Sequence, residues 1–372
     1  MTDVETKASD LMGDFADGMN ARLDDVDSVR AACERFRDSF EALRAQVAIR
    51  IVGQEAVVEQ TLVALFAGGH VLLEGVPGLG KTLLVRSLAD SLGLEFNRIQ
   101  FTPDLMPADV TGTSIVVENG RGGRAFRFRE GPIFANVVLA DEINRATPKS
   151  QSAMLEAMQE RSVSVGSETR ILPDPFLVLA TQNPIEQEGT FPLPEAQLDR
   201  FLLKITVPYA DRGELTEIIR RTTVPGEATI KPVLDAADVL AARQLARRIV
   251  IAPTVKDYAI RLVLSTHPGG EFEIAAFRNY IRVGASPRAA QALVTAAKVF
   301  ALMDGRFAVS LADVRRVALP ALRHRIIRTF EAEADGINTD ELVQGVLDGT
   351  PADSEYPDQF GTRGNNLAEV RR

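Results

Sequence analysis

A glycine-rich segment with one lysine and one threonine offers the clearest chemistry in this sequence. Residues 75–82 read Gly-Val-Pro-Gly-Leu-Gly-Lys-Thr and match the pattern G-x-x-x-x-G-K-[ST] in full. The glycines let backbone N–H groups turn inward around phosphate oxygens, while Lys81 reaches the outer phosphates and the Thr82 hydroxyl can bind Mg²⁺. A chance glycine turn is the alternative. A strand before the motif and a helix after it would favour nucleotide binding instead.

Two carboxylates follow a short apolar run further along the chain. Asp141 and Glu142 come directly after Val137–Ala140. Open α/β sheets bind ligands at the carboxyl ends of their strands, so we expect Asp141 to support Mg²⁺ and Glu142 to polarise an attacking water. Without the glycine-rich loop upstream, an Asp-Glu pair in a plain turn would be the commoner case. Asn183 ends the next apolar run, and its amide is predicted to orient that water, although an asparagine before proline is also typical of a turn. The predicted nucleotide-binding residues are Gly75, Val76, Pro77, Gly78, Leu79, Gly80, Lys81, Thr82, Leu83 and Asp141, with Thr82 and Asp141 as magnesium ligands.

These groups need strands that end together and helices that begin beside them. Short apolar runs predict five strands, and the segment after the glycine-rich loop predicts a helix over 81–92 that Gly93 stops. The alternation of strands and helices predicts an α/β protein with a doubly wound parallel sheet and helices on both faces. Residues 111–129 and 161–173 interrupt the alternation, and the second of these suggests a small hairpin. The predicted strands cover residues 70–74, 95–101, 137–140, 176–180 and 202–207.

The pattern of the chain changes along its length and divides it into four parts. We assign residues 1–34 to an acidic leader, 35–210 to the α/β core, 211–340 to an all-helical domain and 341–372 to a polar tail. Apolar residues at steps of three and four predict a helix between Val29 and Val47. The same spacing recurs three times after Asp211, which is the basis for the helical domain.

Composition excludes several classes of protein. The 372 residues are 45% hydrophobic and 25% charged, as in globular proteins with a large core. Lys and Arg total 42 against 51 Asp and Glu, so a net charge of −9 disfavours binding to nucleic acid or an acidic membrane through bulk charge. The single cysteine, Cys33, excludes an internal disulfide framework and fits a reducing compartment. We find no secretory signal and no apolar run of the ~18 residues that a membrane span needs, so we expect a soluble, cytoplasmic protein without membrane insertion.

Together the motifs resemble those of the AAA+ ATPases, and among these the MoxR family. The resemblance extends from about residue 35 to about residue 340, and its most specific parts are Asp-Glu-Ile-Asn-Arg-Ala and Glu-Ala-Gln-Leu-Asp-Arg-Phe. It implies an ATP hydrolase that uses Mg²⁺, has a P-loop core with a C-terminal helical lid, and assembles as a ring, usually a hexamer. It also implies two insertions, which fall where the alternation is interrupted. The matching segments are Gly75–Thr82, Asp141–Ala146, Ala180–Pro184, Leu193–Phe201 and Gly284–Arg288.

The resemblance also assigns roles to arginines. Arg200 matches the arginine finger, which reaches the γ-phosphate bound by the neighbouring subunit and stabilises charge on the transferred phosphoryl group. Arg288 matches the sensor arginine of the lid, which couples nucleotide state to lid angle. Arg145, beside the acidic pair, is a further candidate for the subunit interface. The alternatives are a surface salt bridge for Arg200 and a solvated arginine at a helix start for Arg288.

For the biological role, the resemblance implies a chaperone-like motor that matures or assembles an unknown client protein. Such proteins often act with a partner that carries a von Willebrand factor A domain. The alternative is a ring ATPase that remodels nucleic acid, because Phe126 and Phe128 alternate with arginines in 120–129 as on some single-strand-binding surfaces. The same alternation is typical of a half-buried hairpin, and the acidic net charge disfavours nucleic acid. A transcriptional-activator ATPase is a third possibility, but the chain lacks a helix-turn-helix region and a Gly-Ala-Phe-Thr-Gly-Ala loop.

Overall fold

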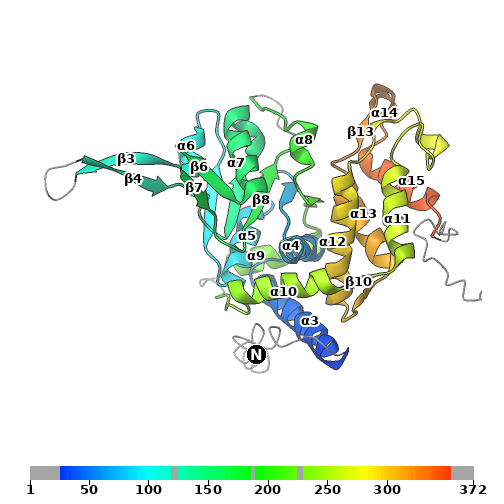
Figure 1. Ribbon diagram of the computed structural model, residues 1–372, viewed down its shortest axis with the longest axis horizontal. Coiled ribbons are helices and arrows are strands. Elements are labelled where there is room, and N and C mark those ends of the chain that lie inside the picture. Colours follow the sequence, from blue (N-terminus) through cyan, green and yellow to red (C-terminus); the bar gives the residue numbers. More distant parts are fainter. Residues whose placement is uncertain (1–25, 119–123, 167, 186–188, 224–228, 353–372) are drawn as a thin grey trace, which may run out of the picture.

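A parallel sheet forms the centre of the protein. The computed structural model describes residues 26–118, 124–166, 168–185, 189–223 and 229–352, and Figure 1 shows how their elements are arranged. The strand order is β2-β5-β8-β1-β9, and every neighbouring pair is parallel. All five predicted strands are therefore confirmed. They are β1 (Val71–Glu74), β2 (Phe96–Gln100), β5 (Val137–Asp141), β8 (Leu177–Gln182) and β9 (Leu203–Thr206).

Both faces of this sheet are buried, which explains why its central strands are continuous apolar runs. Alternate residues of a strand enter two separate cores. Val137 and Leu139 belong to one core, whereas Val138 and Ala140 belong to the other. Helices thus cover both faces, as expected. The first core includes α3 (Val26–Ala48), α4 (Glu55–Ala67) and α5 (Lys81–Ser91), and the second includes α6 (Pro107–Thr111) and α7 (Pro148–Glu160).

The two interruptions of the alternation are antiparallel hairpins. One consists of β3 (Gly112–Glu118) and β4 (Arg124–Glu130), and it projects from the body of the protein (Figure 1). The other consists of β6 (Ser162–Val165) and β7 (Glu168–Ile171). The ring of Phe128 packs 5.8 Å from that of Phe134, with the Arg170 guanidinium 4.3 Å from the Phe128 ring centre. Phe126 is 83% exposed, so the expectation of a half-buried hairpin is wrong for the outer part of β4.

The C-terminal region is mainly helical. Short strands form two further pairs there, β10 with β12 and β11 with β13, so the expectation of an all-helical domain is wrong in this detail. These strands are β10 (Val250–Ile251), β11 (Ile281–Val283), β12 (Ala308–Val309) and β13 (Ile327–Arg328). The helices are α9 (Arg212–Thr222), α10 (Ala236–Arg248), α11 (Pro253–Leu264), α12 (Pro287–Met303), α13 (Leu311–Leu322), α14 (Phe330–Ala334) and α15 (Thr339–Gly349).

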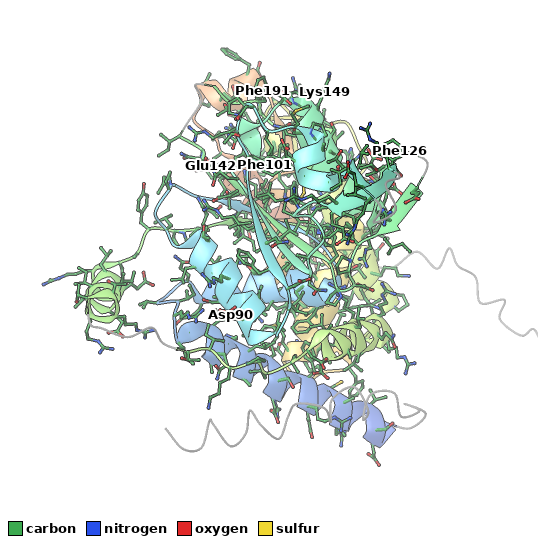
Figure 2. All side chains as sticks on the ribbon, turned by 90° about the vertical axis from the view of Figure 1, so that its left-hand side faces the viewer. Asp90, Phe101, Phe126, Glu142, Lys149 and Phe191 are labelled. Atoms are coloured by element: carbon green, nitrogen blue, oxygen red, sulfur yellow. The ribbon has the colours of Figure 1, made fainter. Side chains whose placement is uncertain are left out.

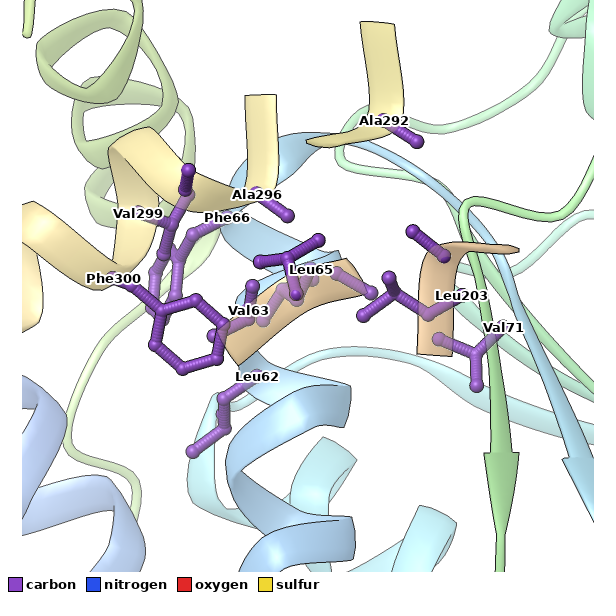
Figure 3. Close-up of a cluster of buried hydrophobic side chains, with 14 of the residues drawn as sticks. Leu62, Val63, Leu65, Phe66, Val71, Leu203, Ala292, Ala296, Val299 and Phe300 are labelled. Atoms are coloured by element: carbon purple, nitrogen blue, oxygen red, sulfur yellow. The ribbon is translucent and has the colours of Figure 1, made fainter. Parts of the chain in front are cut away.

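The long helix α12 joins this region to the core. Figure 3 shows Leu65 and Phe66 of α4 packed with Ala296 and Phe300 of α12, and all four side chains are at most 1% exposed. The same cluster contains Val71 and Leu203, the first residues of β1 and β9. The helix α12 is therefore attached at the edge of the sheet where its strands begin, whereas Arg323, after α13, reaches Thr206 at the last residue of β9.

Two boundaries differ from those expected. The helix α3 begins at Val26, inside the expected leader, because Ala32 and Cys33 are buried together with Phe36 and Phe40. The helix α15 begins at Thr339 in the expected helical domain and continues to Gly349, inside the residues expected to form a polar tail. It is amphipathic, and its apolar side chains are buried against the rest of the helical region: Leu342, Val343, Val346 and Leu347.

Candidate active site

The glycine-rich loop follows β1 and leads directly into α5, as the motif requires. The Gly75 nitrogen donates to the Gln182 carbonyl at 3.2 Å, which ties the start of the loop to the end of β8. Gly78 and Gly80 have φ values of 87° and 75°, a conformation that favours glycine. A Cβ built on either residue would meet no atom within 4 Å. The loop is therefore an open cradle before the N-terminus of α5, which suits a phosphate group.

Lys81 folds back over this cradle. Its Nζ donates to the carbonyl oxygens of Gly75 and Val76, the latter at 3.1 Å. Burial lowers the pKa of Lys81, and the nearby carboxylates of Asp141 and Glu142 oppose that shift. An anionic phosphate oxygen would be a stronger partner for the ammonium group than a neutral carbonyl. The position of Lys81 thus fits nucleotide binding.

Asp141 ends β5 with its carboxylate largely buried. Its Oδ1 accepts from the Thr181 hydroxyl at 2.6 Å, and its Oδ2 accepts from Nε and Nη2 of Arg98 at 3.0 and 2.7 Å. Two carboxylate oxygens offer about four lone-pair sites, so capacity remains for one more donor or ligand. Thr82 is half-buried in the first turn of α5. These are hard oxygen donors of the kind that Mg²⁺ prefers.

In the described part of the chain, no group of three or more His, Cys, Asp or Glu side chains is placed to hold a metal ion. A magnesium ion bound through Thr82 and Asp141 would therefore need phosphate oxygens and water to complete its coordination, which is usual for this ion.

Glu142 follows Asp141 in an unusual backbone conformation. Its φ is 56°, and its N–H donates to the Thr181 hydroxyl at 2.8 Å. Its Oε2 accepts from Gln100 Nε2 at 3.0 Å and from Arg145 Nη1 at 2.9 Å. Figure 2 shows Glu142 next to Phe101, at the ends of β5 and β2. The carboxylate is thus held by two donors in this state, and Arg145, a candidate for the subunit interface, pairs within its own chain.

Asn183 comes directly after β8, the strand next to β5. Its side chain is buried, and its Oδ1 accepts from the Ile185 N–H at 3.1 Å. That contact leaves the amide nitrogen to donate elsewhere. The structure therefore brings Asn183, Asp141 and Glu142 to one edge of the sheet, together with the glycine-rich loop.

Gln54 supports the loop from the N-terminal side, and the motif analysis missed it. It has a φ of 57°, and its Nε2 donates to the Leu79 carbonyl at 3.0 Å. Leu83, which was predicted to bind nucleotide, is 44% exposed on the first turn of α5.

Arg200 and Arg288 lie at the opposite edge of the sheet. Arg200 precedes β9, and the first residue of β9, Leu203, pairs with the first residue of β1, Val71. The phosphate-binding loop instead follows the last residue of β1. A strand of 4 residues spans roughly 13 Å at about 3.3 Å per residue. Arg288 belongs to the Arg200 edge, because its Nη1 lies 3.9 Å from Oδ2 of Asp199.

A cavity of about 350 Å³ opens at this edge. Arg200 and Arg288 line it from the core and from α12, and Arg161 and Arg325 add two more guanidinium groups. Asp199 is its only acidic lining residue among those described. The cavity is consequently electropositive in a protein whose net charge is negative, and it suits an anionic group.

Comparison with known proteins decides the family. Residues 70–203 match the family described as "ATPase family associated with various cellular activities (AAA)", and residues 275–346 match "AAA lid domain". The chain is 47% identical to Chaperone MoxR1 of Mycobacterium tuberculosis, over 80% of this chain and 78% of that protein. The chain belongs to the MoxR family of AAA+ ATPases. It is also 44% identical to the uncharacterized protein YeaC of Bacillus subtilis, over 80% of this chain and 89% of that one.

A solved structure shares the fold of this MoxR-family chain. It is a crystal structure of a protein from Cytophaga hutchinsonii that is 42% identical, with a TM-score of 0.80, and the match covers 86% of this chain and 96% of that one. The resemblance stated from the motifs is confirmed, and so is the AAA+ fold with a parallel sheet and a lid. Within the described residues, no helix is both long enough and apolar enough to cross a bilayer.

Sequence reasoning missed the partners of the acidic pair in this MoxR-family site. Arg98 and Gln100 lie in a predicted strand, but only the strand order places that strand beside β5. Thr181 lies just before the predicted Asn183, at the end of β8, and contacts both Asp141 and Glu142. A polar residue at the end of an apolar strand was the available signal.

Proposed function

We propose that this protein hydrolyses Mg-ATP at sites shared between neighbouring subunits of a ring, most simply a hexamer. One observation carries the shared site: the phosphate-binding loop and Arg200 of one chain lie at opposite edges of the same sheet. Arg200 therefore acts on a nucleotide held by another copy of the chain. A head-to-tail ring, in which one edge of each subunit meets the other edge of the next, satisfies this requirement at every boundary.

The roles at the loop edge follow from the contacts there. Lys81 and the loop N–H groups bind the phosphates, and Thr82 and Asp141 hold Mg²⁺, which when bound neutralises phosphate charge. Glu142 polarises the attacking water once Gln100 and Arg145 release its carboxylate. Asn183 orients that water through its amide nitrogen. Water adds to the γ-phosphorus as the bond to the β–γ bridging oxygen breaks, which gives ADP and phosphate.

The roles at the arginine edge belong to the neighbouring site. Arg200 stabilises the charge on the transferred phosphoryl group from across the boundary. Arg288 shares the electropositive cavity with Arg200, so we place it beside the same neighbouring nucleotide. In this arrangement the lid of one subunit responds to the nucleotide of the next.

The biological role of ATP hydrolysis is proposed from similarity to a named relative. Because one relative is named a chaperone, we propose chaperone-like maturation or assembly of a client protein in the cytoplasm, with a von Willebrand factor A domain protein as partner. Nucleic-acid remodelling is the alternative, and the exposed Phe126 between arginines of β4 favours testing it. Single-stranded DNA should leave the ATPase rate unchanged if the chaperone proposal is right, whereas salt-sensitive stimulation would support the alternative.

A mixing assay of steady-state ATPase tests the shared site. Glu142→Gln and Arg200→Ala should each lose about 10³-fold in kcat or more when assayed alone. Mixed in equal amounts, they should recover about a quarter of the wild-type rate, because random order in a ring pairs intact Glu142 with intact Arg200 at about one boundary in four. Arg288→Ala should behave as Arg200→Ala does.

The control is Arg220→Ala, which removes an exposed arginine that pairs only with Glu217 among the described residues. Its ATPase rate and assembly should match those of the wild type. Light scattering reports assembly for every variant and mixture. Full activity of Arg200→Ala alone, or mixed rings that form without any recovery, would show that the site is not shared.

A further inference from the structure

Asp199, the residue before Arg200, connects the core to the helical region. Its two carboxylate oxygens lie 2.9 and 2.8 Å from the hydroxyl of Ser286, the residue that caps α12. Its Oδ1 also accepts from Arg325 Nε at 2.8 Å. Arg288, two residues after Ser286, lies 3.9 Å from the same carboxylate. One side chain from the core is thus bound by three from the lid.

Arg325 follows α13 and is buried against the backbone around Arg200. Beyond the Asp199 side chain, its guanidinium donates to the carbonyls of Asp199 at 3.2 Å, Phe201 at 2.6 Å and Leu202 at 3.2 Å. The neighbouring His324 places Nε2 3.0 Å from the Phe201 carbonyl as well. Burial lowers the pKa of Arg325, and Asp199 opposes that shift. The lid therefore holds the chain on both sides of Arg200.

The Arg200 side chain has no such support. Within the described residues its guanidinium makes no hydrogen bond or ion pair, although it lines the electropositive cavity. Its direction consequently depends on the backbone from Asp199 to Leu202. That backbone is held by Arg325, and the same carboxylate fixes the start of the helix that carries Arg288.

We propose that Asp199 and Arg325 form a positioning pair that sets where Arg200 and Arg288 stand at the subunit boundary, an inference that rests on the proposed shared site. Both residues line the same cavity, but the Arg325 side chain is only 2% exposed and binds Asp199 and the backbone around Arg200, so we assign the pair to positioning rather than to contact with the nucleotide. Because the pair joins the two arginines to one rigid set of contacts, a displacement of the lid moves both arginines together. Loss of the pair should impair the site of the neighbouring subunit and leave the phosphate-binding loop of its own chain intact.

The variants are Arg325→Met, Asp199→Asn and the double substitution. A misplacement of a reacting group by about 1 Å costs roughly 10²-fold in rate, so each single variant should lose about that factor in kcat. The KM for ATP should stay within about twofold, because each subunit binds ATP through its own loop. Each single variant should also lower the melting temperature by roughly 5–10 °C. Asp199→Asn leaves the buried Arg325 without its carboxylate, and Arg325→Met leaves the carbonyls around Arg200 without their donor. Arg325→Lys keeps the positive charge but loses the planar guanidinium group, so it should recover only part of the kcat that Arg325→Met loses.

The double variant separates positioning from plain stability. Removing both charges should restore part of the melting temperature lost in Asp199→Asn, because no buried charge is left without a partner, while the carbonyls that Arg325 contacts stay without their donor. The kcat should stay low, since neither residue then holds the backbone around Arg200. Recovery of kcat together with the melting temperature would overturn the proposal.

Mixing identifies which edge of the subunit is damaged. Arg325→Met mixed with Glu142→Gln should recover turnover, because Glu142→Gln supplies a well-placed arginine to the intact loop of the other subunit. Arg325→Met mixed with Arg200→Ala should not recover, because both are damaged at the same edge. The opposite pattern, or wild-type kcat for Arg325→Met alone, would overturn the proposal.

The matched control is Arg323→Met. Arg323 also follows α13, but it pairs with Asp340 at 2.8 Å and with the Thr206 hydroxyl at 2.7 Å rather than with Asp199. Its kcat should stay within about twofold of wild type, because neither of its partners holds the backbone around Arg200. If the reference mixture of Glu142→Gln and Arg200→Ala stays inactive, the shared site fails. The comparison of kcat with melting temperature in the double variant then still decides whether the pair positions or only stabilises.

Discussion

Replacing His70 with asparagine tests whether a buried neutral histidine makes the fold sensitive to acid. The ring is buried just before β1, with Nε2 3.1 Å from the Met158 carbonyl and Nδ1 accepting from the Val178 N–H at 3.0 Å. These partners fit the neutral ring with its proton on Nε2, and a second proton on Nδ1 would face the Val178 N–H. Burial, opposed by the Met158 contact and aided by Arg161 and Arg243, lowers the pKa of His70 from 6.5 to about 4.

The direction in which stability changes with pH follows from the number of protons that the folded and unfolded chains bind. Between pH 6.5 and 4 the unfolded chain binds a proton at His70 that the folded chain does not, so the free energy of unfolding falls as pH falls. From about pH 7.5 to about pH 4.5 the loss from this one group is roughly 2.5 kcal/mol, at about 1.4 kcal/mol per pH unit. The stability that His70 provides is fully present only above its unfolded pKa.

Urea unfolding at a series of pH values measures this loss. His70→Asn keeps an acceptor near the Val178 N–H but has no group that titrates in this range, so its unfolding free energy should fall less steeply with pH. The variant should be less stable than wild type at pH 7.5, because it loses the donor to Met158, and the difference should shrink by roughly 2.5 kcal/mol by pH 4.5. Parallel losses in the two proteins across this range would refute the assignment of a neutral buried His70.

Two further substitutions test the acidic pair and the core. Gln100→Leu removes one of two donors to the Glu142 carboxylate, so basal ATPase should rise roughly three- to tenfold, and a fall as deep as that of Glu142→Gln would contradict this. Phe66→Ala should lower the free energy of unfolding by about 3–5 kcal/mol, because Phe66 is 1% exposed and packs 4.9 Å from Phe36. Urea unfolding measures this change. Ile171→Ala, at a side chain that is 83% exposed, should change it little.

The sequence predicts those parts of the fold that depend on patterns of neighbouring residues along the chain. Runs such as 137–140 and 176–180 predicted central strands because a sheet covered on both faces needs no polar side chains. The motif then predicted that the loop, Asp141 and Asn183 would meet, since parallel strands end at a common edge. The helix α15 carried a local signal as well. Asn338 and Glu341 form a capping box before an apolar run. The prediction of a polar tail over 341–372 followed the overall polar composition of that segment and missed this helix signal.

The contacts that the sequence does not predict join residues far apart in the chain. Arg325 and Asp199 are separated by 126 positions, and no local pattern pairs them. His70 gave no sequence signal either, because its neutral state follows from two backbone partners that approach from α7 and β8. Arginines are frequent on protein surfaces, so an arginine that is buried with several carbonyl acceptors is visible only in the folded chain.

The edge of the sheet at which the lid is attached decides which nucleotide its arginine can reach. Packing of α12 against α4 places α12 beside the first residues of β1 and β9, a full strand length from the phosphate-binding loop of the same chain. Arg323, after α13, instead reaches Thr206 at the other end of β9. With the lid at that edge, Arg288 stands next to Arg200 rather than next to Lys81. Under the proposed shared site, hydrolysis in one subunit then acts on the lid of its neighbour through two arginines that Asp199 links to α12 and α13. Coupling of ATP hydrolysis between subunits would thus need no contact beyond those at each boundary. Substitutions at Asp199 should weaken the effect of hydrolysis at one site on the neighbouring site before they weaken ATP binding.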